Sequence, residues 1–417
     1  MDIAARLKAH LDREGLLELL GSLVRIPSVT GEEDAAQEHV ARRLRDLGAE
    51  VDVWPVDVEA LRPLRGFPGG RILTSRQNVV GTLRGTAAGP TLILNGHIDT
   101  VTAGAEERWS HPPFGGEVAN GNLYGRGACD MKGGLAAALA ALGTITRTGI
   151  RLRGSVAFQS VIGEEDGGLG AFAALQQGHR GDAVIVCEPT RLAVIPAQAG
   201  VTIFRITVQG RSAHGCVREE GVDAFERFLP VHAALRALEE RRNRTLRHPL
   251  FEGMALPWPL SIGIVRAGTW PAIVPETLTA EGRIGAAVGE PIAEARRQLE
   301  VAVAQAAASD AWLSAHPPTV EWIGGVWESA ETPADHPLVR MLSRGVEAAT
   351  GQRVSLRGAP YGSDLRLFTN DFKIPGLLFG PGDIRQAHFT DEHVPIAEVE
   401  AAALALAVTI VEFCGTG

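Results

Sequence analysis

The sequence predicts an α/β fold in which helices flank a mostly parallel central sheet and a smaller α+β domain is inserted. Two observations predict the main fold. Segments 91–94 and 183–187 are short and almost wholly apolar, as strands buried on both faces are. Segments with helical periodicity alternate with such strands along the chain. The insertion is predicted because, from residue 200, apolar and polar residues alternate as in a half-exposed antiparallel strand.

Length and composition narrow the class of protein. The chain has 417 residues, which is too long for one compact core and suits two domains. A net charge of −9 at pH 7 disfavours nucleic acid and anionic membranes as partners. Four dispersed cysteines without a Cys-x-x-Cys motif fit a reducing cytoplasm. The N-terminal residues lack the apolar core of a signal peptide, so we expect a cytoplasmic protein that does not bind membranes.

The main domain is expected over residues 1–198 and 328–417. Two helices are predicted over 1–48, separated by a turn at 26–31. A helix over 135–148 follows a glycine-rich stretch, and two more helices are expected over 338–350 and 397–414. The strands expected in this domain are 51–58, 78–83, 91–94, 155–161, 183–187 and 375–379.

The inserted domain is expected over residues 199–327. Its predicted elements follow the order βαββαβ, which is typical of a ferredoxin-like unit. These elements are strands 201–208, 260–265, 278–284 and 319–323 and helices 222–240 and 290–313.

His97 and Asp99 lie at the end of the apolar strand that begins at Thr91. In open parallel sheets, ligands bind and functional residues lie at the carboxyl ends of the strands. Two residues apart on an extended backbone, the two side chains point the same way. Asp99 can then accept the N–H of a histidine whose other nitrogen binds a metal. A lone pair of this kind is more often a hydrogen-bonded polar pair than part of a metal site. Here the metal interpretation is favoured because similar strand ends with potential ligands recur along the chain.

Acidic residues occupy the later strand ends. Glu164, Glu165 and Asp166 follow one strand, and three adjacent carboxylates repel one another unless a cation binds them. Glu188 follows the next buried strand. Asp130 lies just ahead of a helix, where it is either a helix N-cap or a ligand.

Together with a C-terminal histidine, these residues form a set of nitrogen and oxygen donors. Two imidazoles and three carboxylates suit Zn²⁺, Co²⁺ or Mn²⁺. If one carboxylate bridges, each of two ions has three protein ligands and keeps an open position. Glu164, next to a candidate ligand, is the candidate general base. The candidate ligands are His97, Asp130, Glu165, Glu188 and His388.

Several motifs, spread over nearly the whole chain, resemble those of one enzyme family. With these motifs in this order, the chain resembles the co-catalytic zinc amidohydrolases and exopeptidases, which include acetylornithine deacetylase, succinyl-diaminopimelate desuccinylase, aminoacylase and carboxypeptidase G. The resemblance implies a fold like that of the zinc exopeptidases. The motifs are Ile26-Pro-Ser-Val-x-Gly-Glu, Gly96-His-x-Asp-x-Val, the glycine-rich run over 121–134, Glu164-Glu-x-Gly-Gly, Cys187-Glu-Pro-Thr, Ser212-Ala-His-Gly and His388-x-x-Asp-Glu.

The resemblance implies a role in metal binding for five positions. Asp130 would bridge two divalent ions, zinc in the first instance, with cobalt or manganese as alternatives. His97 and Glu188 would bind one ion, and Glu165 and His388 would bind the other.

It also implies roles around the metals. Asp99 would orient the first metal-binding histidine, and Glu164 would be the general base. His214, in the insert, would reach into the partner subunit's site to stabilise an oxyanion, which implies a homodimer built through the insert. Arg283 would bind a substrate carboxylate.

Three positions depart from the family pattern. Gly163 replaces an aspartate before the paired glutamates, which leaves open a register with Glu165 as base and Asp166 as ligand. The glycines at 167 and 168 favour the first register. Ala272 replaces an asparagine that contacts substrate, and Gly282 replaces the usual residue before the arginine.

The predicted function is hydrolysis of the amide of an N-acylated amino acid or a similar small amide, through a metal-bound water and Glu164. An exopeptidase that trims short peptides is the alternative, since both reactions release a free amine. A family-fold protein that binds a ligand without catalysis would have lost the base or a metal ligand, and this chain retains them all.

Overall fold

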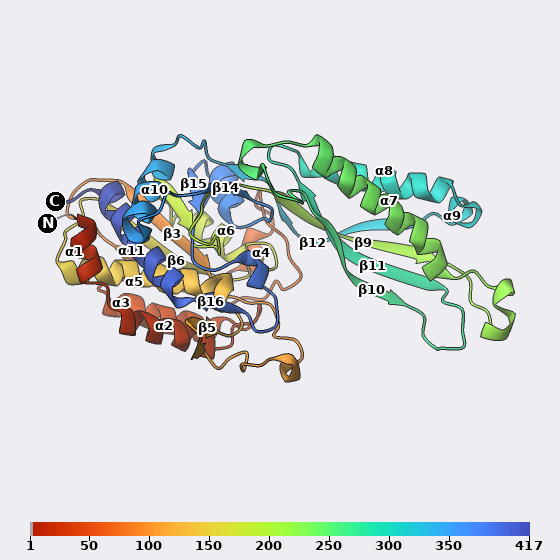
Figure 1. Cartoon of the computed structure of the whole chain (residues 1–417), viewed down its shortest axis with the longest axis horizontal. Coiled ribbons are helices and arrows are strands. Elements are labelled where there is room, and N and C mark those ends of the chain that lie inside the picture. The colour runs from red at the N-terminus through yellow and green to blue at the C-terminus, as the bar shows by residue number, and fades with distance from the viewer. Residues whose placement is uncertain (1–2) are drawn as a thin grey trace. The chain divides into compact units, whose positions relative to one another are not determined.

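The computed structural model describes residues 3–417 and divides into two compact units, and Figure 1 labels many of their elements. Unit 1 runs to Ala197 and resumes over Glu331–Arg357 and Ser363–Gly417. Unit 2 comprises Gln198–Ala330 and Gly358–Gly362. The insert expected from the sequence spans 199–327. The predicted α/β fold class is confirmed, because unit 1 contains a mixed sheet with a parallel centre and helices around it.

A nine-stranded sheet forms the centre of unit 1, in the order β1-β2-β6-β3-β7-β15-β8-β13, with β14 beside β8. The strands β6, β3, β7 and β15 pair in parallel, whereas β1 with β2, β2 with β6 and β8 with β15 pair antiparallel. The strands are β1 Glu50–Pro55, β2 Gln77–Leu83, β3 Thr91–His97, β6 Ser155–Val161, β7 Ala183–Val186, β8 Val194–Gln198, β13 Ala330–Glu331, β14 Leu356–Ala359 and β15 Gly376–Leu378.

The register of the parallel strands determines where the loops begin. His97 of β3 pairs with Val161 of β6, and Asn95 of β3 pairs with Val186 of β7. The carboxyl ends of three strands therefore lie at one edge of the sheet, and the loops that follow them start side by side.

Helices and a small three-stranded sheet, β16-β5-β4, complete unit 1. The segment Ala128–Thr148 is long and apolar enough to cross a membrane, but nearly all of it is buried, as the core helix of a globular domain is. Gly134 in this segment lies so near β7 that an added Cβ would be 1.9 Å from the Cys187 carbonyl oxygen. The elements are α1 Ile3–Ala9, α2 Arg13–Arg25, α3 Asp34–Asp46, α4 Val58–Leu61, α5 Gly133–Thr148, α6 Leu169–Gln176, α10 Pro337–Thr350, α11 Ile396–Cys414, β4 Glu117–Ala119, β5 Asn122–Tyr124 and β16 His393–Pro395.

Two helices were wrongly predicted to be continuous, since an aspartate cap interrupts each of them. The first helix breaks into α1 and α2 where the Asp12 carboxylate accepts the Gly15 N–H at 2.9 Å. The helix predicted over 290–313 breaks where Asp310 accepts the N–H groups of Trp312 and Leu313. Aspartate favours such caps because its side chain competes with the backbone for the N–H groups at a helix start.

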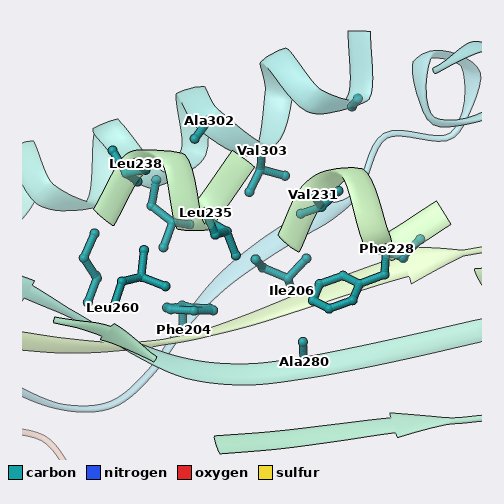
Figure 2. Packing of buried hydrophobic residues seen from close by; sticks show 14 of the residues in the cluster. Phe204, Ile206, Phe228, Val231, Leu235, Leu238, Leu260, Ala280, Ala302 and Val303 are labelled. Carbon is teal, nitrogen blue, oxygen red and sulfur yellow. The ribbon is translucent and has the colours of Figure 1, made fainter. Parts of the chain in front are cut away.

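Unit 2 is an antiparallel sheet with the strand order β10-β11-β9-β12. Phe204 and Ile206 of β9 are fully buried beneath helices α7 and α8, and Leu235 and Val303 of those helices pack toward them in Figure 2. The chain order is the predicted βαββαβ. The elements are β9 Gly200–Gln209, α7 Ala224–Thr245, β10 Leu260–Ala267, β11 Thr277–Ala286, α8 Ile292–Ala308, α9 Ala311–Ala315 and β12 Thr319–Trp327.

Candidate metal centre

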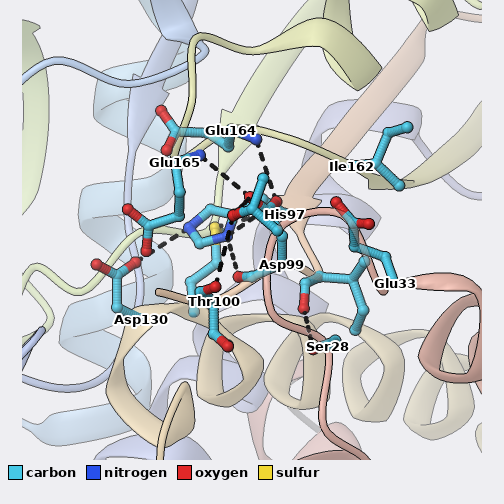
Figure 3. A network of polar contacts seen from close by, with 12 residues as sticks. Ser28, Glu33, His97, Asp99, Thr100, Asp130, Ile162, Glu164 and Glu165 are labelled. Carbon is cyan, nitrogen blue, oxygen red and sulfur yellow. Dashed lines mark hydrogen bonds and ion pairs between the residues drawn. The ribbon is translucent and has the colours of Figure 1, made fainter. Parts of the chain in front are cut away.

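The predicted ligands of unit 1 come together at the shared edge of β3, β6 and β7, as Figure 3 shows in part. His97 is the last residue of β3. Glu164 and Glu165 follow β6, and Glu188 follows β7. Asp130 lies in the turn before α5. Their convergence follows from the strand register, because neighbouring parallel strands end at the same level.

The His97 imidazole lies between a carbonyl and a carboxylate. Its Nδ1 is 2.9 Å from the Asp99 carbonyl oxygen, and its Nε2 is 3.0 Å from Asp130 Oδ1. A carbonyl oxygen only accepts, so Nδ1 carries the hydrogen and, in the neutral ring, Nε2 presents a lone pair to the Asp130 carboxylate. A metal ion between Nε2 and this carboxylate would satisfy both acceptors.

The carboxylate of Asp99 serves a different group from the one predicted. It lies 3.7 Å from His97 Nδ1, whereas it accepts the backbone N–H groups of Glu164 and Glu165 at 3.1 and 3.2 Å. It also accepts the Thr30 hydroxyl at 2.9 Å. Asp99 therefore holds His97 through its carbonyl and holds the acidic turn through its side chain.

Asp130 lies between the two predicted metal-binding histidines. His388 Nε2 is 3.6 Å from Asp130 Oδ2 and 3.0 Å from Glu165 Oε1, while His97 faces the other Asp130 oxygen. Asp130 does not cap α5, since Lys132 precedes the helix and no side chain caps it. One carboxylate with an imidazole at each oxygen is the arrangement that a bridging ligand requires.

The donor set fits divalent metal ions. Ligand atoms of His97, Asp130 and Glu165 lie within 4.8 Å of one another, and so do those of His97, Glu164 and Glu188. Oxygen and imidazole nitrogen donors at this spacing suit zinc, cobalt or manganese. Glu164 therefore lies within reach of the same centre as the ligands.

Burial and the repulsion of neighbouring negative charges raise the pKa values of several carboxyl groups in this centre. Burial raises the pKa of Glu164 well above its usual range, and the charge of Asp364 raises it further. Burial, then the charge of Asp130, likewise raises the pKa of Glu188. Burial raises the pKa of Asp364 to about 7. A cation bound among these groups would offset their repulsion.

Acidic neighbours raise the pKa values of the two imidazoles. Burial alone would lower the pKa of His97, but the hydrogen bond and charge of Asp130 raise it well above the usual range. For His388, burial is opposed by Glu165, which raises the pKa to about 9. Both imidazoles thus face strong negative potential, which also favours metal binding.

The Asp166 carboxylate has other partners, which bears on the alternative register. Its Oδ2 accepts the backbone N–H groups of Arg71 and Ile72 at 2.5 and 2.6 Å. Asp166 thus holds the loop before β2 rather than facing the centre through this oxygen.

Glu392 is a buried residue to which the sequence assigned no role. Its Oε1 accepts the backbone N–H groups of Cys129 and Asp130, each at 3.0 Å, and its Oε2 accepts Arg126 Nη1 at 2.6 Å. Its place in the His388-x-x-Asp-Glu motif was the signal that could have revealed it. Glu392 fixes the backbone that carries the bridging candidate.

Two further buried charges stabilise the surrounding loops. Arg76 binds both oxygens of Glu33 at 2.9 and 3.0 Å, beside the turn that carries Thr30. Lys132 donates to the carbonyl oxygens of Leu23 and Ile26 at 2.9 and 2.8 Å. These contacts attach the N-terminal helices to the candidate centre.

His214 and Arg283 belong to unit 2, and their predicted roles stay predictions. His214 is exposed in the loop after β9. Arg283, on β11, is half-buried and donates to the Pro360 carbonyl at 3.2 Å. Its Nε has no hydrogen-bond partner among the described residues, and burial lowers its pKa.

Known proteins share this sequence pattern and fold. The model of peptidase family M20/M25/M40 matches residues 93–412. The chain is 31% identical to N-formyl-4-amino-5-aminomethyl-2-methylpyrimidine deformylase of Halalkalibacterium halodurans, over 99% of this chain and 98% of that protein. It is 32% identical to succinyl-diaminopimelate desuccinylase of Methylorubrum extorquens, over 92% and 95%. Human carnosine dipeptidase 1 is similar in structure, with a TM-score of 0.81 at 14% identity over 99% of both chains.

Replacing Glu392 should weaken metal binding. We expect Glu392→Ala to lower the affinity for Zn²⁺ about 10- to 100-fold, the usual effect of losing a group that positions a ligand. Competition with a chromophoric chelator measures this affinity. Glu412→Ala, at an exposed ion pair with Arg344, is the control and should bind as the wild type does. A folded Glu392→Ala protein with unchanged affinity would contradict the positioning role.

Proposed function

The chain belongs to peptidase family M20/M25/M40, and on that premise we propose that it is a dinuclear zinc amidohydrolase that removes a small acyl group from an amine. Membership makes the chain a metallohydrolase of amide bonds. The observation that carries the proposal is the position of Asp130 between His97 and His388, with further carboxylates at the ends of β6 and β7, the strands on either side of β3. Zinc suits these donors, and cobalt or manganese are the alternatives.

We assign the ligands as two sets that share one bridge. Asp130 belongs to both sets, His97 and Glu188 complete one, and Glu165 and His388 complete the other. When bound, the two ions supply Lewis-acid activation of water and of the amide carbonyl. The contacts of Asp130 with both imidazoles support this division.

Glu164 is the proposed proton carrier. Amide hydrolysis requires a base that takes a proton from the attacking water and an acid that protonates the leaving amine, and one carboxyl group can do both in turn. Asp99 holds the Glu164 backbone, and the Glu164 carboxylate lies within 4.8 Å of ligand atoms of His97 and Glu188. The alternative register would make Glu165 the base and Asp166 a metal ligand, but Asp166 Oδ2 is engaged with the backbone of residues 71–72.

The substrate is proposed to be a small N-acyl amine, with an N-acylated amino acid as the main candidate. The relatives above 30% identity are named as a deformylase and a desuccinylase, both of which remove an acyl group. Arg283 supports a substrate that carries a carboxylate, because its half-buried guanidinium is a cation with the fork geometry that carboxylates bind. Short peptides are the alternative, as the name of the family suggests.

The proposed assembly is a cytoplasmic homodimer formed through unit 2, in which His214 completes the partner's site. Strand β10 lies at one edge of its sheet and exposes Ile264 and Val265, and helix α7 exposes Phe225 and Leu229. Edge strands and exposed apolar residues of this kind are typical of surfaces that pair with another chain.

A substrate panel tests the reaction. We expect zinc-restored enzyme, but not metal-stripped enzyme, to release amine from one class among N-formyl, N-acetyl, N-succinyl and N-carbamoyl compounds, because the ions activate the water. Release only from dipeptides would favour the exopeptidase. If the enzyme has two metals bound and releases amine from none of these compounds, the proposed substrate class is contradicted.

Replacing the base should separate catalysis from metal binding. Glu164→Gln is expected to lower kcat about 10²- to 10⁴-fold, the usual contribution of a general base, while two metals per chain stay bound. Steady-state kinetics and elemental analysis measure the two effects. Asp166→Asn is the matched control and should keep most of the turnover. The reverse pattern would support the other register.

Mixed dimers test the role of His214 in the partner's site. His214→Ala and Glu164→Ala homodimers should both be nearly inactive. Mixing the two variants should restore about one quarter of the wild-type turnover, because half of the dimers are mixed and each has one complete site. Turnover is measured after subunit exchange. Absence of any recovery in demonstrably mixed dimers would rule out the arrangement.

A further inference from the structure

An exposed cysteine lies beside His214 in the loop after β9. Cys216 Sγ is 2.9 Å from His214 Nδ1, and the backbone N–H of Cys216 donates to the same nitrogen at 3.2 Å. The other three cysteines, Cys129, Cys187 and Cys414, are buried. The thiol next to His214 is therefore the one that solvent reaches.

Two contacts of Cys216, from its backbone N–H and from its thiol, together favour one tautomer of His214. An amide N–H only donates, so Nδ1 must present its lone pair. In the neutral imidazole the hydrogen then resides on Nε2. For the same reason the thiol of Cys216 approaches Nδ1 as a second donor, because an acceptor there would require a hydrogen on Nδ1.

The loop that carries this pair is held by backbone hydrogen bonds. Gly215 N donates to the Ala272 carbonyl at 2.7 Å, and Val274 N donates to the Ala213 carbonyl at 2.9 Å. Val217 N closes the turn onto the His214 carbonyl at 2.9 Å. A groove of about 1140 Å³, lined in part by Gly215, Ala272 and Val274, lies beside the loop. The exposed His214 is thus held at the surface by a fixed backbone.

We propose that Cys216 is a positioning residue that keeps His214 in the Nε2–H form, ready to donate to an oxyanion. The inference rests on the role of His214 proposed above. A group that stabilises a developing oxyanion must donate a hydrogen bond, so the Nδ1–H form, with its lone pair on Nε2, would not serve. A further consequence is that modification of the exposed Cys216 thiol removes one donor, displaces the imidazole beside it and lowers turnover.

Nuclear magnetic resonance of protein labelled with ¹⁵N-histidine tests the tautomer directly. His336 Nδ1 accepts the Leu338 N–H at 3.2 Å and is the reference for the Nε2–H form. His316 Nδ1, 3.2 Å from the Trp312 carbonyl oxygen, is the reference for the Nδ1–H form. His214 should match His336. Cys216→Ala should shift its signals toward a mixture of forms, and Cys216→Ser should restore them.

A His214 spectrum that matches His316 would overturn the inference. An unchanged spectrum in Cys216→Ala would also overturn it, because the thiol would then have no influence on the ring.

Kinetics give a second, independent measurement. Cys216→Ala should lower kcat about 3- to 10-fold with little change in KM, the contribution of one neutral hydrogen bond, and Cys216→Ser should stay within about twofold of wild type. Methyl methanethiolsulfonate should lower wild-type turnover roughly 10- to 100-fold, as displacing a catalytic group does, and reductant should restore it. Cys216→Ser should resist the reagent. Full turnover of singly labelled wild type would overturn the inference.

Failure of this inference and failure of the proposed function give different results. A large loss in His214→Ala together with wild-type turnover and an unchanged His214 spectrum in Cys216→Ala would contradict only the role of Cys216. Full turnover in His214→Ala would contradict the proposed role of His214, and the spectra would still decide the tautomer.

Discussion

The contact of one carboxylate with two imidazoles is the constraint that the fold of unit 1 must satisfy. Asp130 faces His97 with one oxygen and His388 with the other. The three residues come from separate parts of the chain, so the central sheet, the turn before α5 and the C-terminal loop must all be in place. Glu392, bound to Arg126, fixes the backbone of Asp130. The candidate centre therefore forms only when the whole unit folds.

The cluster of buried carboxylates in the candidate centre explains why the loops around it are so extensively hydrogen-bonded. Buried carboxylates with raised pKa values oppose folding unless a cation or hydrogen bonds compensate them. Asp99 supplies part of this compensation by accepting both backbone N–H groups of the acidic turn. Buried ion pairs such as Glu33–Arg76 hold the loops that surround it. The clustered carboxylates create a negative electrostatic potential at one edge of the sheet. This potential favours the binding of divalent metal ions.

The sequence predicted the features that depend on local pattern. Apolar strands such as Thr91–Leu94, the βαββαβ order and the strand-end acids are all readable from neighbouring residues. The exceptions arise from single side chains that act at a distance or compete with periodicity. Asp12 and Asp310 interrupt helices that their apolar spacing would continue. Helix α6 and strand β8 went unpredicted, since each is short and lacks a distinctive period.

Partners set by tertiary structure also escaped sequence analysis. The Asp99 carboxylate binds residues 65 and 66 positions away, and Glu392 binds residues more than 260 positions away. Which oxygen of Asp99 holds His97 depends on backbone direction, which sequence spacing does not specify. The roles of His214 and Arg283 came from resemblance alone, because an exposed loop histidine and a strand arginine carry no local signal.

The most direct measurement is anomalous diffraction at the zinc edge from crystals of the zinc-loaded protein. The account predicts two peaks about 3.5–4 Å apart. One should contact His97 and Glu188, the other Glu165 and His388, with Asp130 touching both and Glu164 bound to neither. A single peak, or a peak coordinated by Glu164, would contradict the dinuclear centre and its base.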